Sequence, residues 1–480
     1  DGYERDGGSY SASDEQGAAC YRVARRLARH AHGMRKYLLI TFLIADSDSF
    51  SRKQRLNLLY RIFCFIFVAP IDKFTMIAEF KVSNFFSIRS EQRLSFIASR
   101  DNFMEEEYIR PVGDSVRLLK IGLIYGSNAS GKSNVLKALA YFRRLMVYTP
   151  SDKNEQMKWV PFLLDDVSRS GHCRMSMTFY LEGKRYILSV EFDNTRIYEE
   201  QLDVYLTNRP TSLYRRTYNR ETDSSEVIFS AKTKLSQKSQ TIIEGNTINN
   251  CTVLAAFGKS NVELSLLNSV YDFFSLAFAD ELTPEKSLSD YTKELLVKDT
   301  DGKLKEFLLY MLRASDFNID NLKLGRASDE RELYFEHSAN GENFELPERY
   351  ESRGTIRFLG MAAILQKLLF NSRFVMIDEL ESSMHYELLS YFIRVFLANS
   401  ENTSQLLFTT HDINLLNEDF IRRDAVWFTD KSSDAETHLE RLSEMGLHKT
   451  MSPYNAYRQG KLVSLPFLGS QYLDLNELAK

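Results

Sequence analysis

The sequence predicts an α/β fold: a mixed sheet with flanking helices, split by an insertion of strands and then helices. Three observations support this. An apolar strand, a Gly-rich loop and a helix succeed one another over residues 118–141. Two later apolar runs, at 373–379 and 405–412, end in acidic or polar side chains. Between these parts, residues 172–205 show β-like runs, and residues 249–317 carry apolar side chains three to four apart.

The composition is typical of a soluble globular protein. The 480 residues allow two or three domains and a large core. Hydrophobic residues make up 44% and charged residues 26% of the chain. A formal net charge of −4 excludes a global basic field for nucleic acid and leaves a local basic face open.

Cysteine usage and hydropathy indicate a cytoplasmic protein without membrane segments. Cys20, Cys64, Cys173 and Cys251 are far apart and form no CxxC pair, so neither a zinc site nor a disulfide framework is expected. A reducing compartment fits this usage. No apolar run reaches the roughly 18 residues of a membrane span.

The first 75 residues differ from the rest. Residues 1–19 are rich in Gly, Ser and Asp, and residues 21–36 are rich in Arg and His. A clear strand pattern begins only at Met76. We therefore expect 1–75 to be an extension that is disordered or not translated, with the true start at Met76 or Met34. A genuine regulatory extension is the alternative, and a targeting peptide is disfavoured because a small-residue cleavage site is missing.

Patterns divide the remaining chain into four parts. We expect an N-lobe at 76–150, an insertion at 151–350, a C-lobe at 351–430 and a C-terminal tail packed on the core at 431–480. The elements expected within them are strands at 77–83, 93–98, 174–181, 185–192 and 196–205, a helix that includes 304–312, and a hairpin at 330–346 with Asn340-Gly341 at its turn.

The Gly-rich loop has the pattern of a phosphate-binding site. Residues 126–133 read Gly-Ser-Asn-Ala-Ser-Gly-Lys-Ser, a complete Walker A motif. Glycines let the backbone wrap a phosphate, and N–H groups at the helix N-terminus point at the anion. We expect Lys132 to neutralise the β- and γ-phosphate oxygens and Ser133 to bind Mg²⁺. The expected nucleotide-binding residues of this loop are Gly126, Ser127, Asn128, Ala129, Ser130, Gly131, Lys132, Ser133 and Asn134.

A second half of the site is expected after residue 373. Arg373-Phe-Val-Met-Ile-Asp-Glu is an apolar strand that ends in two carboxylates, the Walker B pattern. Asp378 is predicted to hold Mg²⁺ opposite Ser133, and Glu379 to orient and deprotonate the attacking water. This pattern is a weak signal alone, and its position after a Walker A loop makes it informative.

Two further segments complete the candidate site. His411 follows an apolar strand and is expected to reach a γ-phosphate; the alternative is a histidine that only caps the strand end. Ser352, Gly354 and Thr355 precede an apolar helix, whose N-terminus suits an anion. A simple N-cap by Ser352 is the alternative, and the two interpretations are compatible. Residues 381–385 occupy the place of a D-loop.

The order of these motifs resembles the ABC/SMC-like ATPases, which include RecF, SMC and OLD proteins. More narrowly, the chain resembles a prokaryotic family of AAA-type ATP-binding proteins that accompanies phage-defence systems. The resemblance covers residues 76–470 and rests on Phe80-Lys-Val-Ser-Asn-Phe-Phe-Ser, Pro161-Phe-Leu-Leu-Asp, Glu351-Ser-Arg-Gly-Thr, Ile377-Asp-Glu-Leu-Glu, Thr410-His-Asp, Arg422-Arg-Asp-Ala-Val-Trp-Phe and Tyr457-Arg-Gln-Gly-Lys-Leu-Val-Ser-Leu-Pro-Phe-Leu.

The resemblance implies an ABC/SMC-like P-loop ATPase core that binds ATP and Mg²⁺ and forms a homodimer or higher homo-oligomer through the ATP sites. Residues 352–355 of one subunit would face the Walker A loop of the other. It also implies a DNA-related or anti-phage role with a separate nuclease or toxin effector, since no Toprim-like acidic motifs follow His411. Two features depart from the family pattern. The signature reads Ser-Arg-Gly-Thr in place of Ser-Gly-Gly-Gln, and Gln156 is only a weak candidate for the Q-loop residue.

Other functions stay open at this point. ATP binding without useful turnover could close a sensor or scaffold, and a RecF-type DNA-repair ATPase is a further alternative. A transporter ATPase fits less well because of the long insertion. Four arginines, Arg215, Arg216, Arg422 and Arg423, are candidates for a DNA face or partners of nearby carboxylates.

Overall fold

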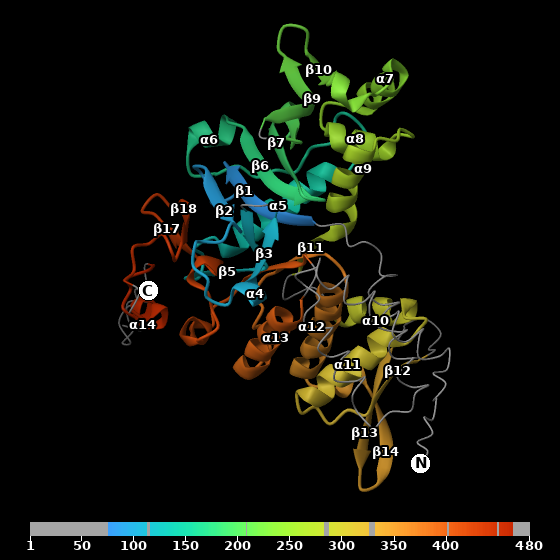
Figure 1. The fold of residues 1–480 in the computed structure, drawn as a ribbon, viewed down its shortest axis with the longest axis vertical. Helices are drawn as coiled ribbons and strands as arrows, with labels where there is room; N and C mark the ends of the chain where they lie inside the picture. The colour runs from blue at the N-terminus through green and yellow to red at the C-terminus, as the bar shows by residue number, and fades with distance from the viewer. Residues whose placement is uncertain are drawn as a thin grey trace, which may run out of the picture. The chain divides into compact units, whose positions relative to one another are not determined.

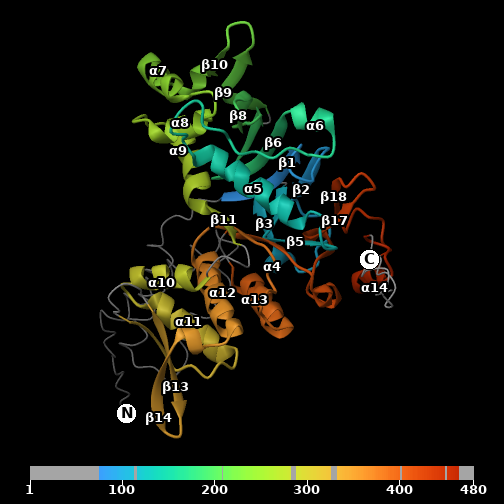
Figure 2. The ribbon, with the colours of Figure 1, turned by 180° about the vertical axis from the view of Figure 1, so that it is seen from behind.

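The computed structural model describes residues 75–463, except for 113–115, 208, 283–287, 326–331, 401–402 and 449–450. Figure 1 shows this part of the chain as a ribbon, and Figure 2 shows it from behind. Residues 1–74 of the predicted extension, with the start at Met34, lie outside the described residues, as does the tail after 463. The expectations for those segments stay predictions.

Five parallel strands and one antiparallel strand form the core sheet. Their order is β11-β15-β16-β5-β17-β18, and β18 is the strand that runs antiparallel. The strands are β5 (Ile121–Gly126), β11 (Phe278–Leu282), β15 (Phe374–Ile377), β16 (Gln405–Thr409), β17 (Val426–Lys431) and β18 (Thr437–Arg441). Every residue of β5, β15 and β16 is buried. Because these three strands are parallel neighbours, their carboxyl ends lie at one edge of the sheet, where α/β proteins place their sites.

The strand predicted at 118–125 is interrupted. The chain there forms β3 (Ile109–Val112), β4 (Val116–Leu119) and then β5, and β4 pairs with β3 instead of joining the core sheet. Lys120 separates β4 from β5. Its buried ammonium donates to the carbonyls of Leu397 and Ser400, at the end of α13 (Tyr386–Asn399). A cation suits the negative end of a helix dipole, which explains the break in the apolar pattern.

A second sheet is antiparallel throughout, with the order β10-β9-β8-β7-β6-β1-β2. Its strands are β1 (Thr75–Ser83), β2 (Gln92–Ser95), β6 (Cys173–Leu181), β7 (Lys184–Phe192), β8 (Ile197–Tyr205), β9 (Pro210–Asn219) and β10 (Ser224–Phe229). The five strands predicted before residue 206 each correspond to one of these. Strands β9 and β10 are not among the predicted strands; few of their residues are buried, so neither shows a clear apolar alternation.

Helices and a small sheet complete the described chain. The helices are α4 (Glu105–Tyr108), α5 (Lys132–Val147), α6 (Asp166–Ser170), α7 (Gln237–Asn246), α8 (Val253–Lys259), α9 (Ser265–Asp272), α10 (Leu288–Lys298), α11 (Lys303–Ala314), α12 (Arg353–Phe370), α13 and α14 (Pro453–Arg458). The predicted hairpin is β13 (Leu333–Ala339) and β14 (Glu342–Pro347), beside β12 (Asn321–Leu324). The stretch predicted as helical at 249–317 also contains β11, which pairs with β15 in the core sheet.

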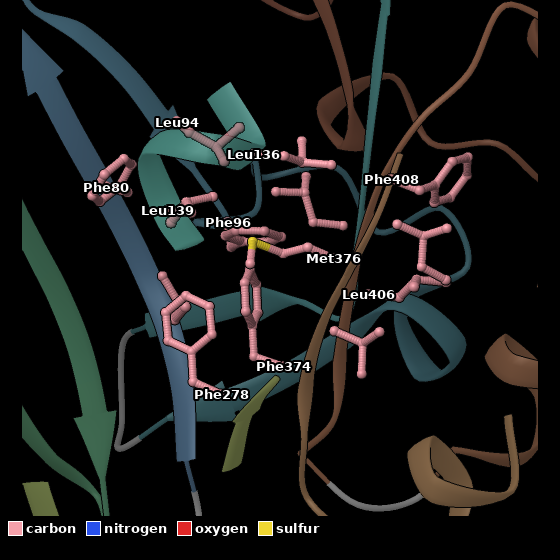
Figure 3. Packing of buried hydrophobic residues seen from close by; sticks show 14 of the residues in the cluster. Phe80, Leu94, Phe96, Leu136, Leu139, Phe278, Phe374, Met376, Leu406 and Phe408 are labelled. Carbon is pink, nitrogen blue, oxygen red and sulfur yellow. The ribbon is translucent and has the colours of Figure 1, made fainter. Parts of the chain in front are cut away.

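Aromatic side chains fill the space between the core sheet and its neighbours (Figure 3). Phe374 of β15 contacts Phe278 of β11 and Phe96, with ring centroids 4.8 and 5.8 Å apart. Phe80 of β1 contacts Phe142 of α5, with ring centroids 5.6 Å apart. Helix α5 therefore packs against the antiparallel sheet as well as following β5.

A polar clasp joins the two sheets. Gln405, at the start of β16, accepts a hydrogen bond from the Ile77 N–H at 2.7 Å. Its Nε2 donates to the carbonyls of Ile77 at 2.9 Å and Leu119 at 3.0 Å. All three bonds are buried, so both donors and the oxygen of the Gln405 amide hold β1 and β4 against the core sheet.

These sheets confirm the predicted α/β class: a mixed sheet with flanking helices, in which the Gly-rich loop follows a central parallel strand. The predicted boundaries of the N-lobe, insertion, C-lobe and tail stay predictions. In the described part of the chain, each helix is too short or too polar to cross a membrane.

Candidate functional site

The Gly-rich loop connects β5 to α5 at the carboxyl edge of the core sheet (Figure 1). Ala129 and Gly131 have left-handed backbone angles, with φ of 62° and 108°. Turns of this kind direct successive N–H groups to one side and form a nest for an anion. The backbone of the loop therefore suits a phosphate group.

The loop packs closely against β17 and β18, and this close packing explains the glycines at positions 126 and 131. A Cβ on Gly131 would lie 2.1 Å from Thr437 Oγ1, and one on Gly126 would lie 2.3 Å from Thr429 Oγ1. The same threonines hold the buried Ser130. Thr429 Oγ1 is 2.6 Å from Ser130 Oγ, and Thr437 Oγ1 donates to the Ser130 carbonyl at 2.9 Å.

Lys132 lies across its own loop. Nζ donates to the carbonyls of Gly126 and Ser127 at 3.0 and 3.1 Å, and the side chain is 6% exposed. Burial lowers the pKa of Lys132, and the carboxylates that follow β15 oppose this shift. The Lys132 ammonium is thus held against the Gly-rich loop, near the carboxylates that follow β15.

One hydroxyl holds both residues of the Walker B pair. Thr409 Oγ1 contacts Asp378 Oδ1 at 2.5 Å and accepts a hydrogen bond from the Glu379 N–H at 2.8 Å. Glu379 has a left-handed φ of 49°. This conformation costs a non-Gly residue about 1–3 kcal/mol and persists only where neighbours enforce it. Strand β16 therefore fixes the turn that carries both carboxylates.

Glu381 and His411 lie beside this turn. Glu381 Oε1 accepts a hydrogen bond from the His411 N–H at 2.6 Å. Burial and the charge of Lys132 lower the pKa of His411, and the carboxylates of Glu381, Glu379 and Asp378 oppose this shift. The imidazole is therefore neutral near neutral pH and lies within electrostatic reach of the loop lysine and the carboxylates.

The signature-like segment begins α12. Ser352 Oγ accepts a hydrogen bond from the Thr355 N–H at 3.0 Å, so Ser352 is an N-cap. Gly354 faces the turn after β15, where an added Cβ would lie 3.3 Å from the Ser383 carbonyl. Within the described residues, no hydrogen bond or ion pair joins 352–355 to 126–134. Binding of an anion by this segment stays a prediction.

The structure thus gathers Lys132, Asp378, Glu379 and His411, whereas residues 352–355 make no hydrogen bond or ion pair with the Gly-rich loop in the described part of the chain. Ser133 lies in the first turn of α5, while Asn128 and Ala129 are exposed at the loop tip. The side chain of Asn134 points to another partner, donating to Ser87 Oγ at 2.6 Å.

Gln156 does not meet this site. It is exposed and lines a small pocket with Tyr148 and Asn250, beside the carboxyl end of α5. The Gly-rich loop lies at the amino end of the same helix. This position argues against Gln156 as the Q-loop residue.

Several residues that support the site were missed in the sequence. Ser87, Thr409, Thr429 and Thr437 act through hydrogen bonds to residues far away in the chain. A lone threonine in a strand carries no local pattern that distinguishes this role. Thr409, which stands two residues before His411, offered the nearest signal.

The four candidate arginines do not form a basic face. Arg216 is fully buried and donates to the Cys251 carbonyl at 2.6 Å. Arg422 pairs with buried Asp424 at 2.8 Å, and Arg423 donates to the Met451 carbonyl at 2.6 Å. Arg215 is exposed. Buried charges need such partners, so the carboxylate-partner alternative holds for Arg422.

The donor set fits a nucleotide with Mg²⁺. Mg²⁺ prefers oxygen ligands and shares them between protein and phosphate. Ser133 supplies a hydroxyl and Asp378 a carboxylate, and Lys132 supplies the cation that phosphate oxygens require. The nest at Ala129–Gly131 provides the backbone donors.

Comparisons with known proteins give one family match and several similar solved structures. A family described as "AAA domain, putative AbiEii toxin, Type IV TA system" matches residues 123–417. The SMC head domain from Thermotoga maritima is 12% identical, over 76% of this chain and 98% of that chain, with a TM-score of 0.36. The SMC head bound to the C-winged helix domain of ScpA is also 12% identical, over 76% and 97%, with a TM-score of 0.39. No curated protein sequence matches the chain.

Proposed function

Because the chain belongs to this family of AAA domains, which matches more than half of it, we propose that it is a Mg²⁺-dependent ATPase. The observation that carries the proposal is the gathering of Lys132, Asp378, Glu379 and His411 at the carboxyl edge of one sheet. Residues 126–133 would bind the phosphates, and Ser133 and Asp378 would hold Mg²⁺, which would neutralise phosphate charge.

The chain's own groups divide the work of hydrolysis. Glu379 accepts a proton from the water that attacks the γ-phosphorus, while the bond to the β,γ-bridging oxygen breaks and leaves ADP and inorganic phosphate. Lys132 balances charge on the phosphates. His411, neutral near neutral pH, hydrogen-bonds to a γ-phosphate oxygen, and the fixed Glu379 turn keeps the carboxylate oriented.

Phosphate release at saturating Mg·ATP, measured beside binding of a fluorescent ATP analogue, tests this proposal. Glu379→Gln should retain binding and lose about 100-fold or more in turnover. Lys132→Ala should weaken binding by about 10- to 100-fold, the value of a charged hydrogen-bonding partner. Lys137→Ala, an exposed lysine on the same helix, is the matched control. Turnover that survives Glu379→Gln would contradict the assignment.

We also propose that two copies bind head to tail through the ATP sites. Residues 352–355 make no hydrogen bond or ion pair with the loop of the same chain among the described residues, which supports this. Turnover per subunit should fall as the protein is diluted from micromolar to nanomolar concentration. A rate that is independent of concentration would contradict the dimer.

The proposed setting is the cytoplasm, in DNA-related or anti-phage defence, with a separate nuclease or toxin as effector. The family description names a toxin and a type IV toxin–antitoxin system, and the described cysteines, Cys173 and Cys251, are free thiols. Tagged Glu379→Gln protein, purified from its host with ATP, should carry the effector with it. Recovery of DNA alone would favour the RecF-type alternative. If biological activity survives Glu379→Gln and fails with Lys132→Ala, the sensor or scaffold alternative is correct.

A further inference from the structure

Helix α12 contacts the catalytic turn of its own chain at two points. Gly354 lies against the Ser383 carbonyl, at 3.3 Å from an added Cβ. One helical turn later, Arg357 Nη2 donates a long hydrogen bond of 3.5 Å to the Glu379 carbonyl. Residues three apart lie on one face of a helix, so a single face of α12 meets the turn that carries Glu379.

Two charged groups at this contact are incompletely satisfied. Arg357 is 7% exposed, and its Nε has no hydrogen-bond partner among the described residues. The same holds for the buried Oε2 of Glu381. A buried charged group without its full set of partners costs free energy, so each such group calls for a physical explanation. The guanidinium also lies within electrostatic reach of the Glu379 and Glu381 carboxylates.

Both ends of the contact meet backbone that is held in a strained conformation. Glu379 has a φ of 49° and Ser383 a φ of 60°. The Glu379 N–H is fixed by Thr409, and its carbonyl accepts from the Ser382 N–H at 2.9 Å as well as from Arg357. The peptide groups on either side of the proposed base are thus tied to β16 in one direction and to α12 in the other.

We infer that Arg357 is a positioning residue that ties the signature-like helix α12 to the Glu379–Glu381 turn of the same chain. The inference rests on the proposed function of Glu379. In the proposed dimer, the nucleotide of the partner subunit meets residues 352–355, one turn before Arg357. When that nucleotide contacts residues 352–355, a shift of α12 moves the Glu379 carbonyl through Arg357. A nucleotide bound at one ATP site therefore sets the orientation of the Glu379 carboxylate at the other.

Hydrogen–deuterium exchange on the full chain, with and without a non-hydrolysable ATP analogue and Mg²⁺, tests this inference. Two peptides are followed, one covering 126–134 and one covering 378–385. Wild-type protein should show protection of both when the analogue binds. Arg357→Gln should keep protection of 126–134 and lose it at 378–385, with turnover reduced at least about tenfold. Arg357→Lys should restore part of both effects because the positive charge returns.

Arg216→Gln is the matched control, because Arg216 is also buried and also has an unpartnered Nε, and it lies on β9, outside the candidate site. It should lose stability without uncoupling the two peptides. Protection of both peptides in Arg357→Gln, or equal loss at both, would overturn the inference and leave Arg357 a packing residue. If wild-type protein shows no protection of 126–134, the proposed nucleotide site itself is wrong, which is a different result.

Discussion

The hydroxyl of Thr409 lies 2.5 Å from Oδ1 of Asp378, and both groups are buried. A hydroxyl that donates to a carboxylate forms one of the stronger hydrogen bonds in proteins. Thr409 accepts from the Glu379 N–H with the same oxygen atom. The proposed metal ligand and the proposed base therefore share one anchor on the neighbouring strand.

Replacing Thr409 by valine should disturb both roles at once. Val keeps the shape and removes the hydroxyl, so the Asp378 carboxylate and the Glu379 N–H each lose a buried partner. We expect a loss of about 1–3 kcal/mol in the free energy of unfolding and a fall in turnover of about tenfold or more. Urea unfolding and phosphate release measure the two effects. Thr409→Ser, which keeps the hydroxyl, should stay close to wild type, and equal damage by both variants would refute this account.

Replacing Gly131 by alanine should damage the nucleotide site more than a typical glycine substitution. The left-handed backbone alone costs about 1–2 kcal/mol, and the new Cβ would lie 2.1 Å from Thr437 Oγ1. We expect ATP-analogue binding to be lost and stability to fall. Gly183→Ala is the control, because Gly183 has a φ of 76° with open space around it. Gly183→Ala should lose only the stability that the left-handed backbone costs, and it should bind the analogue normally. If both variants lose the same stability, the Thr437 side chain moves aside without cost and the prediction is wrong.

His411 should titrate below the ordinary histidine pKa of about 6.5. Burial and the charge of Lys132 both lower its pKa. Because the folded-state pKa is then below the unfolded value, the folded protein resists protonation, and His411 contributes a loss of stability as pH falls below about 6.5. The two-dimensional NMR spectrum of the imidazoles, assigned with His411→Gln, measures the pKa. Lys132→Met should raise it and Lys137→Met should not; a value at or above 6.5 in wild type would contradict the prediction.

Replacing Asp424 by asparagine should destabilise the fold strongly. Burial tends to raise the pKa of Asp424, and the hydrogen bonds and charge of Arg422 outweigh burial and lower it. Asn would leave the Arg422 guanidinium buried beside a neutral group, which costs about 3–5 kcal/mol. Urea unfolding measures the loss. Arg215→Gln, at an exposed position, should change stability by about 0.5 kcal/mol or less; a loss for Asp424→Asn that is no larger would show that the pair is not a structural anchor.

Much of the fold follows from local patterns. Strands β6, β7 and β8 alternate between buried and less buried residues over most of their length, and Asn340-Gly341 marks its hairpin because both residues adopt positive φ. Strand β11 was missed, because its segment lies among helices and its pairing with β15 is made across a long stretch of chain. The break at Lys120 was missed for a similar reason, since its partners are the carbonyls at the end of α13.

The candidate site likewise contains residues that the sequence predicts and residues that it does not. Lys132, Asp378, Glu379 and His411 stand in motifs whose chemistry is carried by neighbouring residues, so the sequence locates them. The threonines behind the loop and the link from Arg357 to Glu379 depend on register between distant elements. No single-sequence pattern records such pairings. Arg216 and Arg422 were candidates for a DNA face. Only the structure, through their buried partners, shows that both side chains are buried.

The clasp made by Gln405 has a consequence for how the protein is synthesised. Gln405 follows Ile77 by 328 positions and Leu119 by 286. The antiparallel sheet can pair as soon as residues 75–229 leave the ribosome, whereas β5 meets β16 and β17 only after residue 431 is made. During most of translation the nascent chain therefore carries its Gly-rich loop on β5 without the lateral neighbours β16 and β17, which leaves an apolar edge of the kind that chaperones shield. Pairing with β16, which Gln405 ties to β1, covers one edge of β5, and pairing with β17 covers the other.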